Sequence, residues 1–393
     1  MTAIAWSTSS DLGSDLRVRD LDSGPTLPLV LSPRRAGPRD PRWLTAWVRD
    51  HRSGLDQALI EHGAILFRGF GVTRPEDFES VALAFEPGLG RDYLGTSPRN
   101  AVTDYVFTAS ELPPHYPIPQ HCEMSFLAHP PRNLFFYAHR PNDGAGGETP
   151  LCDFRAVWRD LDPVVRARFE QRGVRHIRNY VGPGKTGRDL WKLKRWDEMF
   201  QTTDRALVEA KCRENGIEFE WIGGGQPGSA RPSADGDRLR LTNVQPAARP
   251  HPDTGEPVWF NHAQVFHLSA ASGELKRVAR RPGQARSAFF AALAAGLVAV
   301  KRRTSAPEAQ AMHTTFGDGS EISDSDMEAV RDAIWKNLVA YPWQRGDIVL
   351  IDNAAVSHGR FPYRGPREVH VAWGPAFGRT RADLERGPSG RVG

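Results

Sequence analysis

The chain has 393 residues, which is enough for one large domain or two ordinary ones with a substantial core. Its net charge is only +4 and its longest cationic run is Lys301-Arg302-Arg303, which argues against a nucleic-acid-binding protein. Three cysteines without a C-x-x-C pair are typical of a reduced, cytoplasmic protein rather than a disulfide scaffold, and we expect no signal peptide.

The first half of the chain predicts an N-terminal helical layer followed by strands. Residues 1–40 are rich in Ser, Asp, Pro and Arg and predict a loose lead-in. Apolar residues at helical spacing follow, and then residues 63–70 predict a strand. Pro75 with acids directly after it indicates a helix start. Residues 119–153 predict several strands, with a glycine-rich turn at 142–147.

The middle of the chain is less regular. Residues 155–172 return to a helical pattern, and residues 180–240 are polar, rich in Gly and Pro, and contain three tryptophans. So long an irregular stretch inside a compact domain is typical of an active-site lid. The apolar run 288–300 is too short to cross a membrane. We interpret it as a buried helix with a cationic last turn rather than as a membrane-surface helix.

The final elements predict how the domain is organised. One apolar helix face, which Pro342 ends, is marked by Met327, Val330, Ile334 and Leu338. A buried strand is predicted at 348–351. Strand blocks on both sides of a long helical and loop stretch indicate one β-core with an excursion between its halves. We therefore expect a single domain over 41–380 with an insertion at about 155–340, and a flexible tail at 381–393.

Two tripeptides combine a histidine with an acid two residues later, namely His121-Cys-Glu123 and His251-Pro-Asp253. Strand alternation would direct His121 and Glu123 to one face, whereas the prolines and glycine around His251 predict a turn. We therefore favour the first pair, and His358, just after a predicted buried strand, is the candidate third ligand. Two imidazoles and a carboxylate on one face of an octahedron are the donors of a mononuclear non-haem iron(II) site, with three positions left open.

An arginine begins the last predicted strand, residues 367–373. Arg367 has the same parity as Val369 and Val371, so we expect it to be directed inward with these valines. A buried guanidinium needs an anion, and a carboxylate such as that of 2-oxoglutarate can accept two parallel hydrogen bonds from it. Arg360 and Arg364 are the alternative candidates for this role.

Several motifs, in order from about residue 64 to 375, carry a family resemblance. They include Ser97-Pro-Arg99, Pro119-Gln-His121-Cys-Glu123-Met-Ser-Phe126, Gly146-Gly-Glu-Thr149-Pro, Pro342-Trp-Gln-Arg-Gly-Asp347, His358-Gly-Arg and Gly365-Pro-Arg367. With these motifs the chain resembles the taurine dioxygenase (TauD/TfdA)/clavaminate synthase-like superfamily of iron(II)- and 2-oxoglutarate-dependent dioxygenases. Within it the chain is most similar to the syringomycin-type amino-acid β-hydroxylases.

The resemblance implies a mainly β fold with helices (α+β), built on a cupin-like double-stranded β-helix, or jelly roll, with a long helical and loop insertion. It implies that His121, Glu123 and His358 bind iron(II), and that Thr149 and Arg367 bind 2-oxoglutarate. Related halogenases have a small residue in place of the carboxylate ligand. Glu123 therefore indicates hydroxylation or another oxidation rather than halogenation.

The implied reaction is oxidative decarboxylation of 2-oxoglutarate by O2, coupled to hydroxylation of an unactivated C–H bond. The expected substrate is an amino acid or amino-acid derivative, free or tethered to a peptidyl carrier protein, in specialised metabolite (antibiotic) biosynthesis. Desaturation, epoxidation or cyclisation with the same cofactors is one alternative, and a non-catalytic jelly-roll binding protein is another. We expect no nucleic-acid or membrane partner.

The predicted lid at 180–240 carries a cluster of cations: Lys185, Arg188, Lys192, Lys194 and Arg195. These side chains could pair with a substrate carboxylate or with an acidic carrier domain. A solvated helix face is the alternative interpretation of the same cluster.

Overall fold

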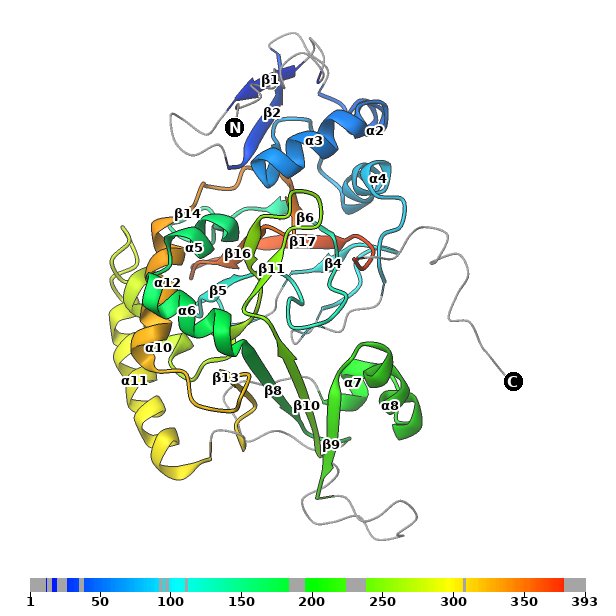
Figure 1. Cartoon of the computed structure of the whole chain (residues 1–393). Helices are drawn as coiled ribbons and strands as arrows, with labels where there is room; N and C mark the ends of the chain where they lie inside the picture. The colour runs from blue at the N-terminus through cyan, green and yellow to red at the C-terminus, as the bar shows by residue number, and fades with distance from the viewer. Residues whose placement is uncertain are drawn as a thin grey trace, which may run out of the picture.

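The computed structural model describes residues 12, 16–19, 27–34, 39–91, 95, 99–109, 112–183, 195–223, 238–306 and 309–377. Its larger sheet lies across the upper half of the molecule in Figure 1 and has seven strands. Their spatial order is β1 (Leu16–Arg19), β2 (Leu29–Pro33), β3 (Ala64–Phe67), β15 (Ile348–Asp352), β6 (Asn133–Arg140), β17 (Glu368–Trp373) and β4 (Phe107–Thr108). All of its pairings are antiparallel except that of β2 with β3.

A second, smaller sheet faces the first. Its strands are, in spatial order, β14 (Leu338–Val339), β7 (Leu151–Asp153), β16 (Val356–Arg360) and β5 (Ile118–His121). One buried apolar cluster joins Phe136 and Val371 of the larger sheet to Leu151 and Val356 of the smaller sheet. The two sheets therefore pack face to face, and the smaller sheet carries the two histidines predicted to bind a metal.

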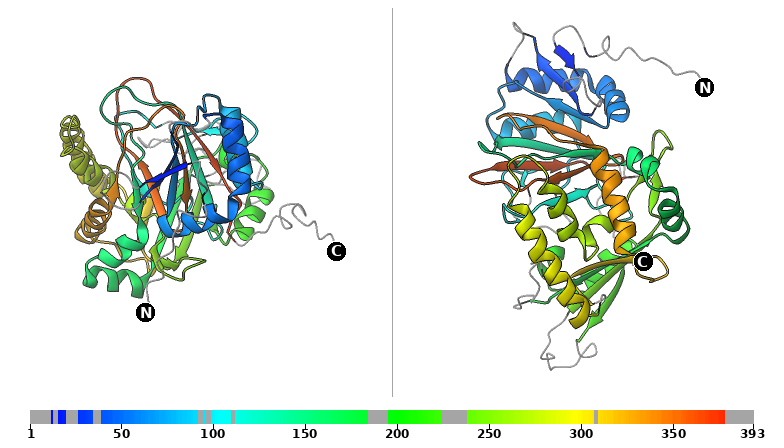
Figure 2. Two further views of the ribbon diagram at one scale, coloured as in Figure 1. Left: turned by 90° about the horizontal axis from the view of Figure 1, so that it is seen from above. Right: turned by 90° about the vertical axis from the view of Figure 1, so that its left-hand side faces the viewer.

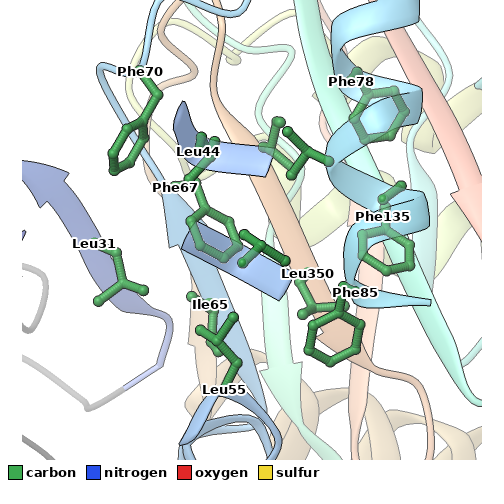
Figure 3. Close-up of a cluster of buried hydrophobic side chains, with 14 of the residues drawn as sticks. Leu31, Leu44, Leu55, Ile65, Phe67, Phe70, Phe78, Phe85, Phe135 and Leu350 are labelled. Carbon is green, nitrogen blue, oxygen red and sulfur yellow. The ribbon is translucent and has the colours of Figure 1, made fainter. Parts of the chain in front are cut away.

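Three helices cover the other face of the larger sheet: α2 (Pro41–Asp50), α3 (Arg52–His62) and α4 (Pro75–Phe85). Figure 3 shows the resulting core, in which Phe67, Phe135 and Leu350 from the strands meet Leu44 and Phe85 from the helices. Burial of these large apolar side chains on the helix-covered face fixes which way each strand faces.

The elements between β7 and β14 form a separate layer, on the side opposite α2–α4 in Figure 2. Helices α5 (Phe154–Asp160) and α6 (Pro163–Arg172) lead into a sheet of order β13 (Met312–Phe316), β8 (Val174–Tyr180), β10 (Arg238–Gln245) and β9 (Glu218–Ile222). A hairpin of β11 (Ala248–Pro250) and β12 (Pro257–Trp259) follows. The remaining helices are α7 (Trp196–Phe200), α8 (Arg205–Glu214), α9 (Ala263–Phe266), α10 (Ala270–Val278), α11 (Ser287–Thr304) and α12 (Asp324–Lys336).

This third sheet packs against the segment that follows β5. Tyr180 of β8 and Leu241 of β10 share a buried cluster with Met124 and Phe126. The segment after β5 is therefore enclosed between the smaller sheet and the third sheet.

Several predicted elements are confirmed. The predicted strands at 63–70 and 348–351 contain β3, which is shorter than predicted, and β15, and the two lie side by side in antiparallel register. Helix α4 begins at Pro75, with Glu76 and Asp77 in its first turn, as predicted. At the predicted glycine-rich turn, Gly146 has a φ of +89°, which favours glycine over other residues.

Other predictions were wrong in part. Within the predicted loose lead-in, residues 16–19 and 29–33 form β1 and β2, because the short apolar run around Leu31 is buried beside β3. Within the predicted irregular stretch 180–240, residues 195–223 contain α7, α8 and β9. Leu338 does not continue α12, which ends at Lys336. It begins β14 and pairs with Cys152 instead.

The prediction of a buried helix at 288–300 was also wrong. Helix α11 exists, but only Ser287 and Ala291 of its residues are buried. Figures 1 and 2 show α11 at the outside of the molecule. It packs against α10. An apolar run specifies no neighbour, so the pattern could not tell a buried helix from an exposed one. Among the described residues, no helix is both long and apolar enough to span a membrane.

Candidate active site

The three predicted metal ligands converge. His121 of β5 and His358 of β16 are direct cross-strand partners, and their ring centroids are 4.4 Å apart. Glu123 follows the end of β5. One donor atom from each of the three side chains lies within 4.8 Å of the other two. This compact set of two imidazoles and one carboxylate has the composition of a facial triad.

A turn, and not strand alternation, delivers Glu123. The strand ends at His121, and Met124 has a left-handed φ of +53°. Asn353 holds the turn in place, since its side chain accepts from the Glu123 backbone N–H at 2.6 Å and donates to the Glu123 carbonyl at 3.0 Å. The predicted convergence is thus present, but the extended path expected for residues 121–125 is not. Ser125 instead hydrogen-bonds a different histidine.

That histidine is His262, which sequence reasoning did not single out. Its Nδ1 lies 2.7 Å from the Ser125 hydroxyl, and its ring lies 5.3 Å from that of His121. Burial holds the pKa of His262 well below its usual range, so the ring is neutral. It sits just before the short helix α9, where no motif marks it.

Both candidate histidine ligands are in the form that binds metals. Nδ1 of His121 lies 2.9 Å from the Pro119 carbonyl and donates to it as the neutral tautomer, which leaves Nε2 as the lone-pair donor. Burial lowers the pKa of His121, and it holds the pKa of His358 well below the usual value. Nε2 of His358 lies 3.7 Å from Oε2 of Glu123. Neutral imidazoles beside a carboxylate are the donor set that a divalent iron ion accepts.

A buried arginine contacts the candidate carboxylate ligand. Nη2 of Arg99 donates to Oε2 of Glu123 at 2.7 Å, and both side chains are buried. The guanidinium also lies 5.8 Å from the Trp373 ring. The ion pair offsets the cost of burying the Glu123 charge and fixes the orientation of the carboxylate. Arg99 belongs to the Ser97-Pro-Arg99 motif noted in the sequence. No local pattern predicts its contact with Glu123, because the two residues are 24 positions apart.

The structure brings Arg367 and Thr149 together. Arg367 Nη2 donates to the Thr149 hydroxyl at 3.1 Å, and its Nε donates to the Gly147 carbonyl at 2.7 Å. Burial, together with neighbouring Arg360, lowers the pKa of Arg367 to about 10, so the guanidinium is still charged at neutral pH. Across the described part of the chain, no carboxylate lies within 4.0 Å of it. The positive charge is therefore available to an anion.

Thr149 lies beside the smaller sheet that carries the histidines, whereas Arg367 directly precedes β17 of the larger sheet. His358 is the cross-strand partner of Leu151, and Thr149 precedes Leu151 by two residues. Two residues of extended chain correspond to roughly 7 Å. The strand parity used to predict Arg367 does not apply strictly, because the ladder has a bulge between Glu368 and Val369. Arg367 nevertheless points to Thr149.

The alternative arginines have other environments. Arg360 is buried, and its Nη2 donates to three backbone carbonyls, those of Leu112, Pro113 and Tyr116. Arg364 is exposed. Neither has a hydrogen bond to Thr149 in the described structure, so Arg367 is the better candidate.

The second His-x-acid tripeptide forms a turn, as predicted. His251 is buried and its Nε2 lies 2.7 Å from Oδ2 of Asp352, while Asp253 pairs with Arg132. Most of the cationic cluster of the predicted lid lies outside the described residues, namely Lys185, Arg188, Lys192 and Lys194. Its last member, Arg195, pairs at 3.0 Å with Asp197 and with Glu198 at the start of α7.

The comparisons with known proteins decide the family. Residues 31–373 match the taurine catabolism dioxygenase TauD, TfdA family. The chain belongs to this family. It is 33% identical over 319 residues to the dapdiamide synthesis protein DdaC of Enterobacter agglomerans, covering 81% of this chain and 84% of that protein. It is 31% identical over 355 residues to a clavaminate synthase-like protein of Arabidopsis thaliana, covering 87% and 92%.

Among solved structures, the chain is similar to PvcB of Pseudomonas aeruginosa, with a TM-score of 0.49 and 14% identity over 95% of this chain and 94% of that one. As a TauD-family protein, the chain is an oxidoreductase, a dioxygenase that uses iron(II), 2-oxoglutarate and O2. Its architecture of mixed helices and sheets agrees with that family.

Proposed function

We propose that this dioxygenase hydroxylates an unactivated C–H bond of an amino acid or amino-acid derivative. In this proposal His121, Glu123 and His358 hold the iron(II), and Arg367 with Thr149 binds 2-oxoglutarate. The observation that carries the proposal is the convergence of two neutral imidazoles and one carboxylate within 4.8 Å, in a chain of this family.

The protein residues have separate tasks in this reaction. When bound, the iron supplies oxygen activation, driven by decarboxylation of 2-oxoglutarate to succinate and CO2. Arg367 and the Thr149 hydroxyl, which are hydrogen-bonded to each other, would both donate to the far carboxylate of 2-oxoglutarate. Arg99 keeps Glu123 oriented by donating to its Oε2. The two facing sheets and the third sheet enclose the site and exclude water from the reacting atoms.

The finer structural assignments are also part of the proposal. We infer that the two facing sheets form the double-stranded β-helix, and that residues of about 155–340 are an insertion into one domain of 41–380. We assign the chain to the syringomycin-type hydroxylases and place it in the cytoplasm. Its three cysteines are free and buried, which supports a reducing compartment.

The substrate class rests on the relatives. DdaC is named for dapdiamide synthesis, which supports a role in specialised metabolite biosynthesis. A substrate tethered to a peptidyl carrier protein and a free amino acid are both compatible with this role. Oxidation without net oxygen insertion, as in desaturation or cyclisation, would use the same residues.

Product analysis tests the proposal. The protein is reconstituted with iron(II), supplied with 2-oxoglutarate, O2 and a panel of free and carrier-tethered amino acids, and followed by mass spectrometry and by succinate release. We expect one substrate to gain a single oxygen atom with stoichiometric succinate. His121→Ala should abolish both signals, whereas Asp253→Asn, in the second His-x-acid tripeptide, should retain them. A product that has lost two hydrogens instead would replace hydroxylation by desaturation.

A further inference from the structure

Helix α11 exposes a row of large apolar side chains. Phe289, Leu293, Leu297 and Val300 are 70%, 51%, 41% and 56% exposed. They are spaced by four, four and three residues, so they lie on one side of the helix and form a single stripe, which we call the α11 stripe. Monomeric proteins rarely expose contiguous apolar rows of this kind, and those that do use them for binding.

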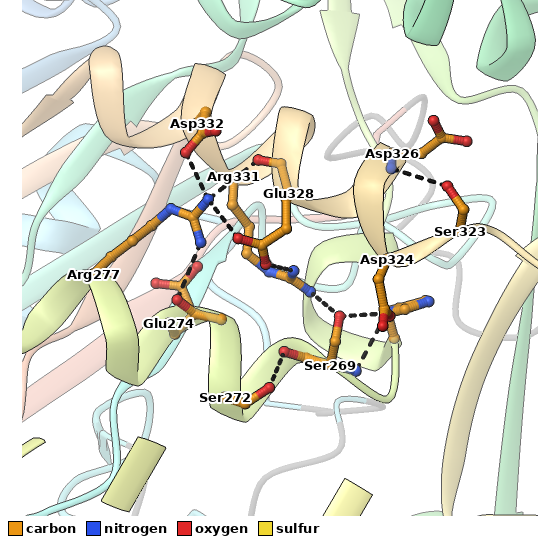
Figure 4. A network of polar contacts seen from close by, with 12 residues as sticks. Ser269, Ser272, Glu274, Arg277, Ser323, Asp324, Asp326, Glu328, Arg331 and Asp332 are labelled. Atoms are coloured by element: carbon orange, nitrogen blue, oxygen red, sulfur yellow. Dashed lines mark hydrogen bonds and ion pairs between the residues drawn. The ribbon is translucent and has the colours of Figure 1, made fainter. Parts of the chain in front are cut away.

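Contacts on its other side and near its C-terminal end attach α11 to the rest of the fold. Its other side contacts α10. Near its C-terminal end, Arg302 pairs with Asp324 at the start of α12 at 2.5 Å. Figure 4 shows how α10 and α12 are themselves joined, with Arg277 pairing with Asp332 at 2.6 Å and Arg331 donating to Ser269 at 3.0 Å. The apolar row therefore remains on the outside without unfolding or rotation of the helix.

The chain segment that contains α11 carries charges of one sign only. Residues 275–303 contain eight Lys or Arg residues and no Asp or Glu. Some of these cations are paired with acids of α12. Arg286 and Arg303, one at each end of α11, have no carboxylate within 4.0 Å in the described structure. An antiparallel pair of two copies of α11 would place these like charges together, which disfavours a second copy as the occupant.

The N-terminal end of the stripe adjoins a cavity of about 300 Å³. Arg286 and Phe290 line it together with Tyr363 and Arg364 from the loop before β17. The Tyr363 ring lies 5.5 Å from the Arg367 guanidinium. A protein seated on α11 would therefore reach the outer side of the loop that ends at the proposed 2-oxoglutarate arginine.

We propose that the α11 stripe is a docking surface for a partner protein that presents an acidic amphipathic helix. The apolar face of that helix would cover Phe289, Leu293, Leu297 and Val300, and its carboxylates would pair with Arg286 and Arg303. The proposal stands independently of the identity of the oxidised substrate.

Binding of designed peptides to the full-length protein tests the docking surface. The acidic probe is a labelled helix of the same length as α11, 18 residues, with a leucine stripe and glutamates elsewhere. The basic probe has lysines in place of the glutamates. We expect the acidic probe to bind at least about ten-fold more tightly than the basic one, measured by fluorescence anisotropy. Leu293→Gln and Arg303→Glu should each weaken binding about ten-fold.

The controls separate this surface from the catalytic site. Val164→Gln, which changes a 64% exposed apolar residue on α6, should bind the acidic probe like the wild type. All variants should keep their circular dichroism and their iron-dependent succinate formation, so a failure of the enzymatic proposal would leave the binding result interpretable. Equal binding of the two probes, or an unaffected Leu293→Gln variant, would overturn the proposal.

Two further measurements test whether a membrane or a second copy of the chain covers the α11 stripe instead. Co-sedimentation with phosphatidylglycerol vesicles that is lost in Leu293→Gln would assign the stripe to a membrane surface, against the proposal. A concentration-dependent dimer, seen by sedimentation velocity and lost in the same variant, would assign it to a second copy, also against the proposal.

Discussion

The surroundings of His358 and the outer face of α11 depart from the usual distribution of residues in opposite ways. Around His358, imidazoles, a carboxylate and a guanidinium are buried, and among them Arg99 pairs with Glu123. On α11, leucines and phenylalanine are exposed to water. Burying polar groups and exposing apolar ones both cost free energy. Each region is therefore a place where a bound species would recover that cost.

The largest expected effect is on the metal. His358→Ala should leave the protein without stoichiometric iron and reduce turnover to background, because two ligands seldom retain a facial iron(II) site. Iron content after reconstitution and desalting, with succinate formation, measures both. His129→Ala, a change at an exposed histidine, serves as the control. Full turnover in His358→Ala would show that His358 is not an iron ligand.

The next largest effect concerns the uncompensated charge of Arg367. Arg367→Met should weaken 2-oxoglutarate binding by about 3 to 5 kcal/mol, or roughly two to three and a half orders of magnitude, because a carboxylate in the site would lose its charged partner. Iron binding should persist. Titration of the anaerobic iron protein with 2-oxoglutarate gives the affinity, and the exposed Arg364→Gln is the matched control. If only Arg364→Gln lost affinity, the assignment would pass to that arginine.

The two regions should also differ in what a leucine contributes to folding. Leu350, in β15, is fully buried in the core of Figure 3, so Leu350→Ala should lower the free energy of unfolding by about 2 to 5 kcal/mol. Leu293→Ala on α11 should change it by no more than about 0.5 kcal/mol. Urea unfolding of both variants measures the difference. A large loss in Leu293→Ala would show that the stripe is covered within the protein itself.

Buried neutral histidines predict a smaller, pH-dependent effect. Burial, with Arg331 nearby, lowers the pKa of His267 to about 4, against about 6.5 in the unfolded chain. Below pH 6.5 the unfolded chain takes up a proton that the folded chain does not, so stability is complete above that pH and falls as the pH drops toward 4. At pH 5 this histidine accounts for a loss of about 2 kcal/mol.

Urea unfolding between pH 8 and 5 checks this dependence. His267→Gln keeps the possibility of hydrogen bonds to Ser269 and to the Ile322 carbonyl, but it does not titrate. Its stability should fall less steeply with decreasing pH than that of the wild type. Identical slopes for the two proteins would mean that His267 is protonated in the folded state.

The features that the sequence predicted correctly are those encoded over a few residues. Alternating or continuous apolar residues predicted β3 and β15, and a proline followed by acids predicted the start of α4. The ligand triad was predicted from a local tripeptide and one distant histidine, and the structure brings all three together. The roles of these residues as iron ligands remain proposals.

The features that were missed depend on partners far away in the chain. The Asn353 side chain that shapes the turn at Glu123 lies 230 residues from it, and nothing near either residue signals the contact. The exposure of α11 was missed for a related reason. Its sequence is apolar on nearly every side, and only the three-dimensional position of α10 decides which side is covered.

The long separation of the two proposed histidine ligands, His121 and His358, has a consequence for how the enzyme is made. Gln120 and Ser357, which directly precede His121 and His358, are hydrogen-bonded at 2.7 Å across 237 residues. A ribosome adding 5 to 20 residues per second needs roughly 10 to 50 s between the two histidines. During that time a nascent chain contains only one histidine and the carboxylate of the proposed triad, namely His121 and Glu123. If these residues bind the iron as proposed, we expect stable loading only once the chain is nearly complete, and a product truncated before β16 would lack one proposed ligand.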